Sequence, residues 1–187
     1  MKKRNIVPFA LLLIAFLLWS YFKEEPKQKS SKVHHPNYIA YNLSSIHYDK
    51  KGEISHRMFA DKATTFSQKN NTVFINPRVI VYVRNKDNKQ ISTWQISSEN
   101  GKLEDQNILK LSTNVRVENL SLDQLIQNMA TEKLTLILDK KEISSNLFVT
   151  WDGPQMHQQG IGMWASLLSN EFIVKNNIKA VYFNEKI

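Results

Sequence analysis

A seven-residue pattern with an asparagine at its fourth position recurs along this chain and constrains its fold more than any other feature. The pattern apolar-x-x-Asn-apolar-x-apolar occupies residues 111–117, 143–149 and 174–180, and residues 75–81 form a looser copy. The copies begin at steps of 36, 32 and 31 residues. A repeat of this length is typical of stacked supersecondary units, each of which needs neighbours to cover its apolar face. The sequence therefore predicts a series of β-hairpins.

The best-defined hairpin covers residues 97–117, where two strands flank a polar turn at residues 104–107. Successive side chains of a strand point to opposite faces, so the second strand has one apolar face. That face consists of Leu109, Leu111, Val115 and Val117. We also predict a bulge or turn at each repeated asparagine, with at least two of Asn114, Asn146 and Asn177 at positive φ.

Further strands are predicted where β-branched, aromatic and alternating apolar residues cluster. They are expected within residues 46–54 (a hairpin with its turn at Asp-Lys-Lys-Gly), 54–66, 72–83, 91–97, 140–151 and 161–183. Pro77 predicts an edge position or a bulge. Residues 119–129 combine helical with alternating spacing, and we interpret them as a strand because their neighbours are strands. A single open sheet of this size would expose one apolar face. The predicted fold class is therefore all-β, a folded-over antiparallel sheet or β-jellyroll.

The N-terminal region carries a separate signal. Residues 6–22 contain no charged side chain and follow a basic tail at residues 1–5. As a helix this stretch would measure about 25 Å, slightly less than a hydrocarbon core of roughly 30 Å. A cleaved signal peptide is the alternative, but cleavage favours small residues where this chain has Trp19, Tyr21 and Phe22. We expect an uncleaved transmembrane anchor.

This anchor defines the predicted domain organisation. Residues 1–5 form a cytoplasmic tail, 6–22 the anchor, 23–37 a polar linker and 38–187 a periplasmic β domain. Lysines at 23, 27, 29 and 32 follow the anchor, so the charge rule supports this orientation only in part.

Composition and motifs exclude several function classes. Residues 1–32 hold seven Lys and Arg against two Glu, so most of the net charge of +8 lies outside the β domain and a nucleic-acid role loses its support. The chain has no cysteine, which excludes disulfides and thiolate chemistry. Phosphate-loop, His-Glu-x-x-His and Gly-x-Ser-x-Gly motifs are absent from the sequence. The adjacent histidines 34 and 35 lie on the linker, where they rarely converge on a metal. We predict no cofactor, no metal and no enzymatic activity.

Several of these stretches resemble the LptC family, the bitopic inner-membrane component of the lipopolysaccharide export bridge. Residues 48–60, YDKKGEISHRMFA, are similar to its first hairpin, and residues 109–117 fit the family's Leu-x-Leu-x-x-Gly-x-Val-x-Val. Asn114 stands where the family usually has glycine, but asparagine is the next most tolerant residue at positive φ. The remaining matches are Phe74 to Pro77, Trp94, Ile96, Gly153 and Gly160.

The resemblance implies a periplasmic OstA-like β-jellyroll whose apolar interior is open along a seam and accommodates the acyl chains of lipid A. The residues expected in this groove are Phe74, Val79, Val81, Leu109, Leu111, Val115, Val117, Leu136, Leu147, Val149, Ile178, Ala180 and Tyr182. A dry core is the alternative for each of them, in which case the chain is an anchored β scaffold without lipid binding. A second alternative is a glycan hydrolase, which would need a pair of inward carboxylates that the strand faces do not offer.

The resemblance also implies two protein partners, an inner-membrane ABC transporter of the LptBFG type and a periplasmic bridge protein of the LptA type. Exposed strand edges suit both, because their unpaired backbone groups can accept an added strand. The N-terminal edge, expected to face the transporter, comprises Tyr38, Tyr41, Leu43, Ile46 and Tyr48. The C-terminal edge, expected to face the bridge protein, comprises Phe172, Val174, Lys175, Ile178, Lys179, Ala180 and Tyr182.

Overall fold

The computed structural model describes residues 13–19, 36–66, 70–84 and 90–183. The chain divides into two units, Met1–His34 and His35–Ile187. In the first unit residues 13–19 are helical. Within the described ranges, no helix has the length and apolar character needed to cross a membrane. Most of the predicted anchor and linker lies outside the described residues, so both stay predictions.

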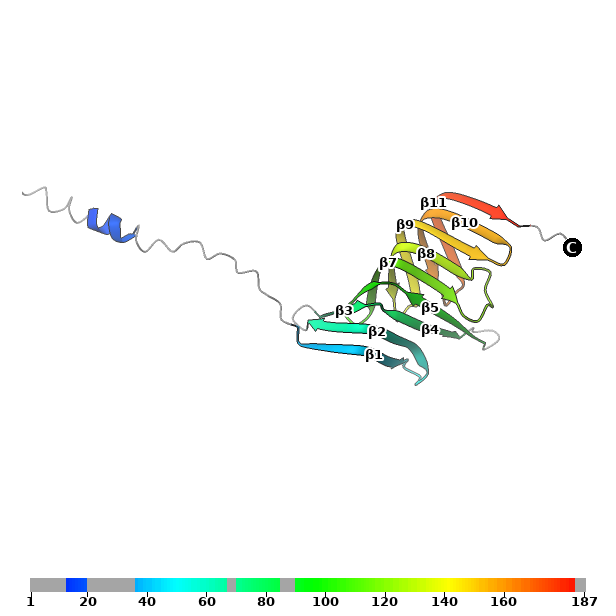
Figure 1. The fold of residues 1–187 in the computed structure, drawn as a ribbon, viewed down its shortest axis with the longest axis horizontal. Coiled ribbons are helices and arrows are strands. Elements are labelled where there is room, and N and C mark those ends of the chain that lie inside the picture. Colours follow the sequence, from blue (N-terminus) through cyan, green and yellow to red (C-terminus); the bar gives the residue numbers. More distant parts are fainter. Residues whose placement is uncertain (1–12, 20–35, 67–69, 85–89, 184–187) are drawn as a thin grey trace, which may run out of the picture. The chain divides into compact units, whose positions relative to one another are not determined.

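The second unit is a single antiparallel sheet of eleven strands, drawn from cyan to red in Figure 1. The prediction of an all-β domain is confirmed. The strands are β1 (Tyr38–Tyr48), β2 (Ile54–Phe66), β3 (Asn71–Ile75), β4 (Arg78–Arg84), β5 (Ile91–Ser97), β6 (Asn100–Glu104), β7 (Ile108–Asn119), β8 (Asn128–Ile137), β9 (Glu142–Gly153), β10 (Met156–Ser166) and β11 (Glu171–Tyr182).

Breaks and bulges in the middle of the strands divide the sheet into two halves. β3 pairs with the C-terminal half of β2, whereas β4 pairs with its N-terminal half. The break between β3 and β4 lies at Asn76, which has positive φ, and Pro77. β6 and β5 divide β7 in the same way. Pro77 was predicted to mark an edge position or a bulge, and it instead separates two strands inside the sheet, because proline cannot donate to a continuous ladder.

The repeated asparagines continue this line of bends into the later strands. Register shifts fall at Asn114 in β7, at Asn146 in β9 and at Asn177 in β11. Asn114 and Asn177 have φ values of 53°. The predicted bulges, with two of the three asparagines at positive φ, are confirmed. Since the copies lie one hairpin apart, the bulges fall on alternate strands of the sheet, β7, β9 and β11, and fold the sheet over.

The two halves face each other across a seam, the side where the turns of one half approach the turns of the other. The Lys141 ammonium in the β8–β9 turn donates a hydrogen bond to the backbone carbonyl of Tyr82 in β4, although β4 and β9 are not paired in the sheet. Buried apolar side chains from both halves form one cluster between them. This arrangement agrees with the predicted folded-over sheet.

One predicted strand is wrong. Residues 120–127 form a loop between β7 and β8, not a strand. The backbone N–H of Asp123 donates to the Asn119 side-chain oxygen over 3.2 Å, and the Asn119 amide donates back to the Asp123 carboxylate over 3.0 Å. Ser92 of β5 also donates to that carboxylate. These polar contacts end β7 at Asn119. They hold the following residues in a loop, although the spacing of the leucines there is compatible with a strand.

Candidate lipid-binding interior

Nine of the predicted groove residues are fully buried and belong to one cluster. Their side chains are at most 2% exposed, and they line the inner faces of strands from β3 to β9. These residues are Phe74, Val79, Val81, Leu109, Leu111, Val115, Val117, Leu136 and Val149. The sequence therefore identified the inner face of the folded sheet. In this structure that face is a packed core along most of its length.

Leu147 lies outside the interior, which corrects its predicted place in the groove. Its side chain is 40% exposed and lines a groove on the outer surface. The reason is the bulge at Asn146, which adds a residue and breaks the alternation of inner and outer side chains in β9.

The inner face becomes exposed at the C-terminal end of the sheet. Tyr182 is directly opposite Met156, a buried member of the core, so both side chains lie on the same face. Ala180 is opposite Gln158, two residues along each strand, and so lies on the same face. Ile178 lies in the bulge after Asn177, where the register shifts, so alternation does not assign it to either face. Tyr182 and Ile178 are 72% and 57% exposed. Ala180 and Tyr182 therefore extend the inner face beyond the core, where no further strand covers them in the described chain.

An apolar cavity of about 340 Å³ opens beside this end of the interior. Its walls come from both halves of the sheet, from the loop 120–127 and from the β10–β11 turn. The ring of Phe172 meets the ring of Trp151 edge-on, with centroids 5.0 Å apart. The main apolar lining is Trp94, Ile126, Met129, Trp151, Met156 and Phe172.

Of this lining, only Phe172 was among the predicted site residues, as part of the C-terminal edge. Phe172 and Val174 do lie on the edge strand β11, and their side chains pack against the core. The large aromatic side chains of Trp94 and Trp151, each on an alternating strand, were the available signal. Their place beside one cavity depends on the pairing of β5, β7, β8 and β9, which no local pattern encodes.

The loop 120–127 presents apolar side chains at the mouth of the cavity. Leu125 lines the cavity and is 74% exposed, and Leu122 is 68% exposed. The loop is nevertheless held firmly, because the backbone N–H of Thr93 donates to the Ser121 hydroxyl over 2.9 Å and Gln127 donates to the Asp152 carbonyl over 2.8 Å. A rigid loop with exposed leucines at an apolar opening suits contact with hydrocarbon.

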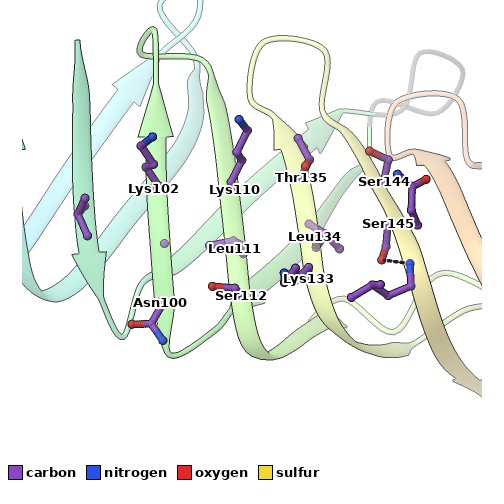
Figure 2. Close-up of a pocket in the computed structure, with 14 residues that line it drawn as sticks. Asn100, Lys102, Lys110, Leu111, Ser112, Lys133, Leu134, Thr135, Ser144 and Ser145 are labelled. Carbon is purple, nitrogen blue, oxygen red and sulfur yellow. Dashed lines mark hydrogen bonds between the residues drawn. The ribbon is translucent and has the colours of Figure 1, made fainter. Parts of the chain in front are cut away.

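A second groove lies on the outer surface and is chemically different (Figure 2). It measures about 580 Å³ and crosses strands from β3 to β9. Figure 2 shows Lys102 and Lys110 on neighbouring strands, with Lys133 beyond them. Glu104 lies 2.8 Å from the Lys102 ammonium and 2.5 Å from that of Lys110. These two contacts lower the pKa of the Glu104 carboxyl. This groove differs from the interior cavity because three lysines stand among its lining residues, beside apolar ones such as Leu111 and Leu147.

Both predicted edges are present in the described sheet. β1 pairs only with β2, and β11 pairs only with β10. On β1, Leu43 packs against the core, and the other predicted edge residues are exposed: Tyr38, Tyr41, Ile46 and Tyr48. On β11, Lys175 and Lys179 are exposed together with Ile178, Ala180 and Tyr182. Metal-binding clusters of three or more His, Asp or Glu side chains do not occur among the described residues.

Comparison with known proteins places this fold in a family. A family model described as lipopolysaccharide-assembly, LptC-related, matches residues 7–183. The lipopolysaccharide export system protein LptC of Haemophilus influenzae is 23% identical over 200 residues, covering 96% of this chain and 96% of that protein. The protein of the same name from Escherichia coli strain K12 is 22% identical over 160 residues, covering 86% and 82%. Since the family model spans nearly the whole chain, including all eleven strands, this chain belongs to the LptC family.

Proposed function

We propose that this chain is a membrane-anchored adaptor for lipopolysaccharide export. It receives lipopolysaccharide from an inner-membrane ABC transporter of the LptBFG type and passes it to a periplasmic bridge protein of the LptA type. Its acyl chains travel along the apolar inner face of the folded sheet. The chain performs no catalysis, so the energy for transport comes from the transporter.

The observation that carries this proposal is the apolar cavity of about 340 Å³ at the exposed end of the inner face. A dry core would end in polar side chains, whereas here the apolar face continues past the core to Ala180 and Tyr182. Buried acyl chains gain about 0.8 kcal/mol per CH₂ group. A shallow, continuous apolar face holds such a chain by several kcal/mol without trapping it in one deep pocket.

An acyl chain can enter the packed part of the interior only after the two halves of the sheet separate. Side chains such as Val79 and Leu109 leave no room for an acyl chain while the two halves of the sheet are in contact. Because the strands connect the two halves only along the line of bends, opening the seam would separate the apolar cluster between the halves and expose the inner face without breaking strand pairs. Lipid would enter as the halves separate.

The two sheet edges support the proposed partners. β1 follows the linker in the chain, so it is assigned to the transporter, and β11 is assigned to the bridge protein. Backbone groups on an edge bind an added strand, while exposed lysines such as Lys175 and Lys179 disfavour indiscriminate pairing. The anchor at residues 6–22 would keep the domain beside the inner membrane.

Photo-crosslinking in cells that make lipopolysaccharide tests this function. A benzophenone amino acid replaces Ile126 at the apolar cavity, and a matched control replaces Lys133 on the outer surface. We expect a lipopolysaccharide adduct from position 126 and none from position 133. An unmodified protein at both positions, despite normal folding, would favour an anchored β scaffold that binds no lipid.

A further inference from the structure

A charged cavity of about 830 Å³ lies next to the apolar cavity at the seam. The two are neighbours because consecutive residues of the β10–β11 turn enter them: Leu167 lines the apolar cavity and Leu168 the charged one. β5 borders both, through Trp94 and Ile91 respectively. An apolar and a charged site in this arrangement suit an amphiphile, with acyl chains in one and a polar head in the other.

The charged cavity has an excess of positive charge. Among the described residues, its charged lining consists of Lys51, Arg57, Arg84 and Lys141 against Asp49 and Glu53, which leaves two cations in excess. Glu53 is already paired with Arg84 at 3.0 Å. The Asp49 carboxylate accepts the backbone N–H groups of Lys51 and Glu53 over 2.8 and 3.0 Å, so it serves the β1–β2 turn.

Three of these cations lack a carboxylate partner in the described part of the chain, and two of the three, Arg57 and Lys141, are partly buried. The Arg57 Nε is buried and has no hydrogen-bond acceptor among the described residues. Lys141 is half-buried, and its ammonium donates to the neutral Tyr82 carbonyl, with no carboxylate of the described chain within ion-pair distance. Burial lowers the pKa of Lys141, against the weaker attraction of Asp49 and Glu53. Partly desolvated cations of this kind are costly unless an anion joins them.

We propose that this cavity binds a phosphate monoester group, with Arg57 and Lys141 as its principal ligands. A phosphate monoester carries a charge of about −1.5 to −2 near neutral pH, which matches the excess of two cations. The planar guanidinium of arginine fits phosphate oxygens bidentately, and lysine adds a point charge. On the proposed function, the group is the phosphate of the lipid whose acyl chains occupy the adjacent apolar cavity. A free phosphate ion has the same chemistry, so the test separates the two sources.

The test measures binding to the full-length protein in non-ionic detergent. The lipid probes are bis-phosphorylated lipid A and the same lipid after enzymatic removal of both phosphates, and inorganic phosphate is the third probe. The variants are Arg57→Gln and Lys141→Met, with Lys133→Met as the matched control that removes one exposed lysine from another face. We expect each cavity variant to weaken binding of the phosphorylated lipid about tenfold, as for loss of a charge-assisted hydrogen bond. Binding of the dephosphorylated lipid should be unchanged.

The outcomes separate the headgroup site from the function. Equal affinity of wild-type protein for both lipids, with no effect of either cavity variant, overturns the phosphate site and leaves the adaptor role intact. Binding of inorganic phosphate that depends on Arg57 and Lys141, without binding of any lipid, keeps the site and overturns the adaptor role. If neither phosphate nor lipid binds, both are overturned. Two independent cavity variants keep the test decisive if one of them does not fold.

Discussion

The inner face behaves differently in two regions of the same sheet. Around β4, β5 and β7 it is a dry core, with Val79, Ile96 and Leu109 fully buried. Along the end of β11 the apolar side chains of Ile178 and Tyr182 are mostly exposed. Both regions carry large apolar side chains, so the difference comes from what covers each strand. In the described sheet β11 pairs only with β10, and no strand lies beyond it.

The largest predicted effect is the loss of partner binding when the exposed end of β11 is removed. The sequence predicts that deletion of residues 172–187 abolishes binding to the bridge protein and spares the transporter. Phe172 and Val174 pack on the core, so the sharper variant deletes residues 178–187 only. It should abolish copurification with the bridge protein while transporter association persists. Proline at Lys179 should act in the same way if the N–H of that residue bonds the partner.

The control for this prediction is folding, measured by urea denaturation of the truncated protein. Equal loss of both partners would indicate misfolding. Loss of the transporter alone would reverse the assignment of β1 and β11.

Truncation of a side chain in the buried region should reduce stability instead. Leu111→Ala leaves a cavity in the core and should lower the free energy of unfolding by about 2–5 kcal/mol. The matched change on the exposed face, Ile178→Ala, should cost less than about 1 kcal/mol because little area is lost. Urea denaturation of both variants measures the difference. Similar costs would mean that β11 is covered in solution, and the comparison between the two regions would then be wrong.

A histidine in the buried region should make stability depend on pH. His56 is buried, its ring nitrogens have no hydrogen-bond partner among the described residues, and its ring stacks on His47 at 4.5 Å. Burial first, then the charges of His47 and Lys141, lowers the pKa of His56 to about 4 from 6.5. Between these values the unfolded chain binds more protons, so the free energy of unfolding falls as pH drops through this window.

The full effect is on the order of 3 kcal/mol. His56→Phe keeps a ring against His47 and removes the proton-binding group, so it should flatten the pH dependence between pH 6.5 and 4. Urea midpoints of both proteins at several pH values measure this. A variant that loses stability as steeply as wild type in this window would show that other groups cause the acid sensitivity.

The sequence predicted those parts of the molecule that local patterns determine. Alternation identified the inner faces of β4 and β7, and the spaced asparagines identified the bulges. The loop at residues 120–127 was missed because its conformation depends on Ser92, about thirty residues away, whose hydroxyl donates to Asp123. The two cavities were also out of reach, because their walls combine turns that meet only across the seam. Leu167 and Leu168 line different cavities, which no periodic pattern could indicate.

The smallest predicted effect is a loss of stability on substitution of the asparagines at the bulges, where the sheet folds over. Asn114 has a φ of 53°, and its amide donates to the Glu99 carboxylate over 2.5 Å, whereas Asn146 has no positive φ. Alanine tolerates the left-handed region poorly, at a cost of about 1 kcal/mol or more. Asn114→Ala should therefore destabilise the domain by roughly that amount. Asn114→Gly, which loses the same hydrogen bond, should cost less because glycine adopts this φ freely.

Asn146→Ala is the matched variant at a bulge without positive φ, and its cost should also be smaller. If all three variants were equally destabilised in urea, the side-chain contacts and not the backbone conformation would explain why asparagine recurs. In that case hydrogen bonds from the asparagine side chains to neighbouring strands would determine where the sheet bends. Glycine would then be a poor replacement for Asn114.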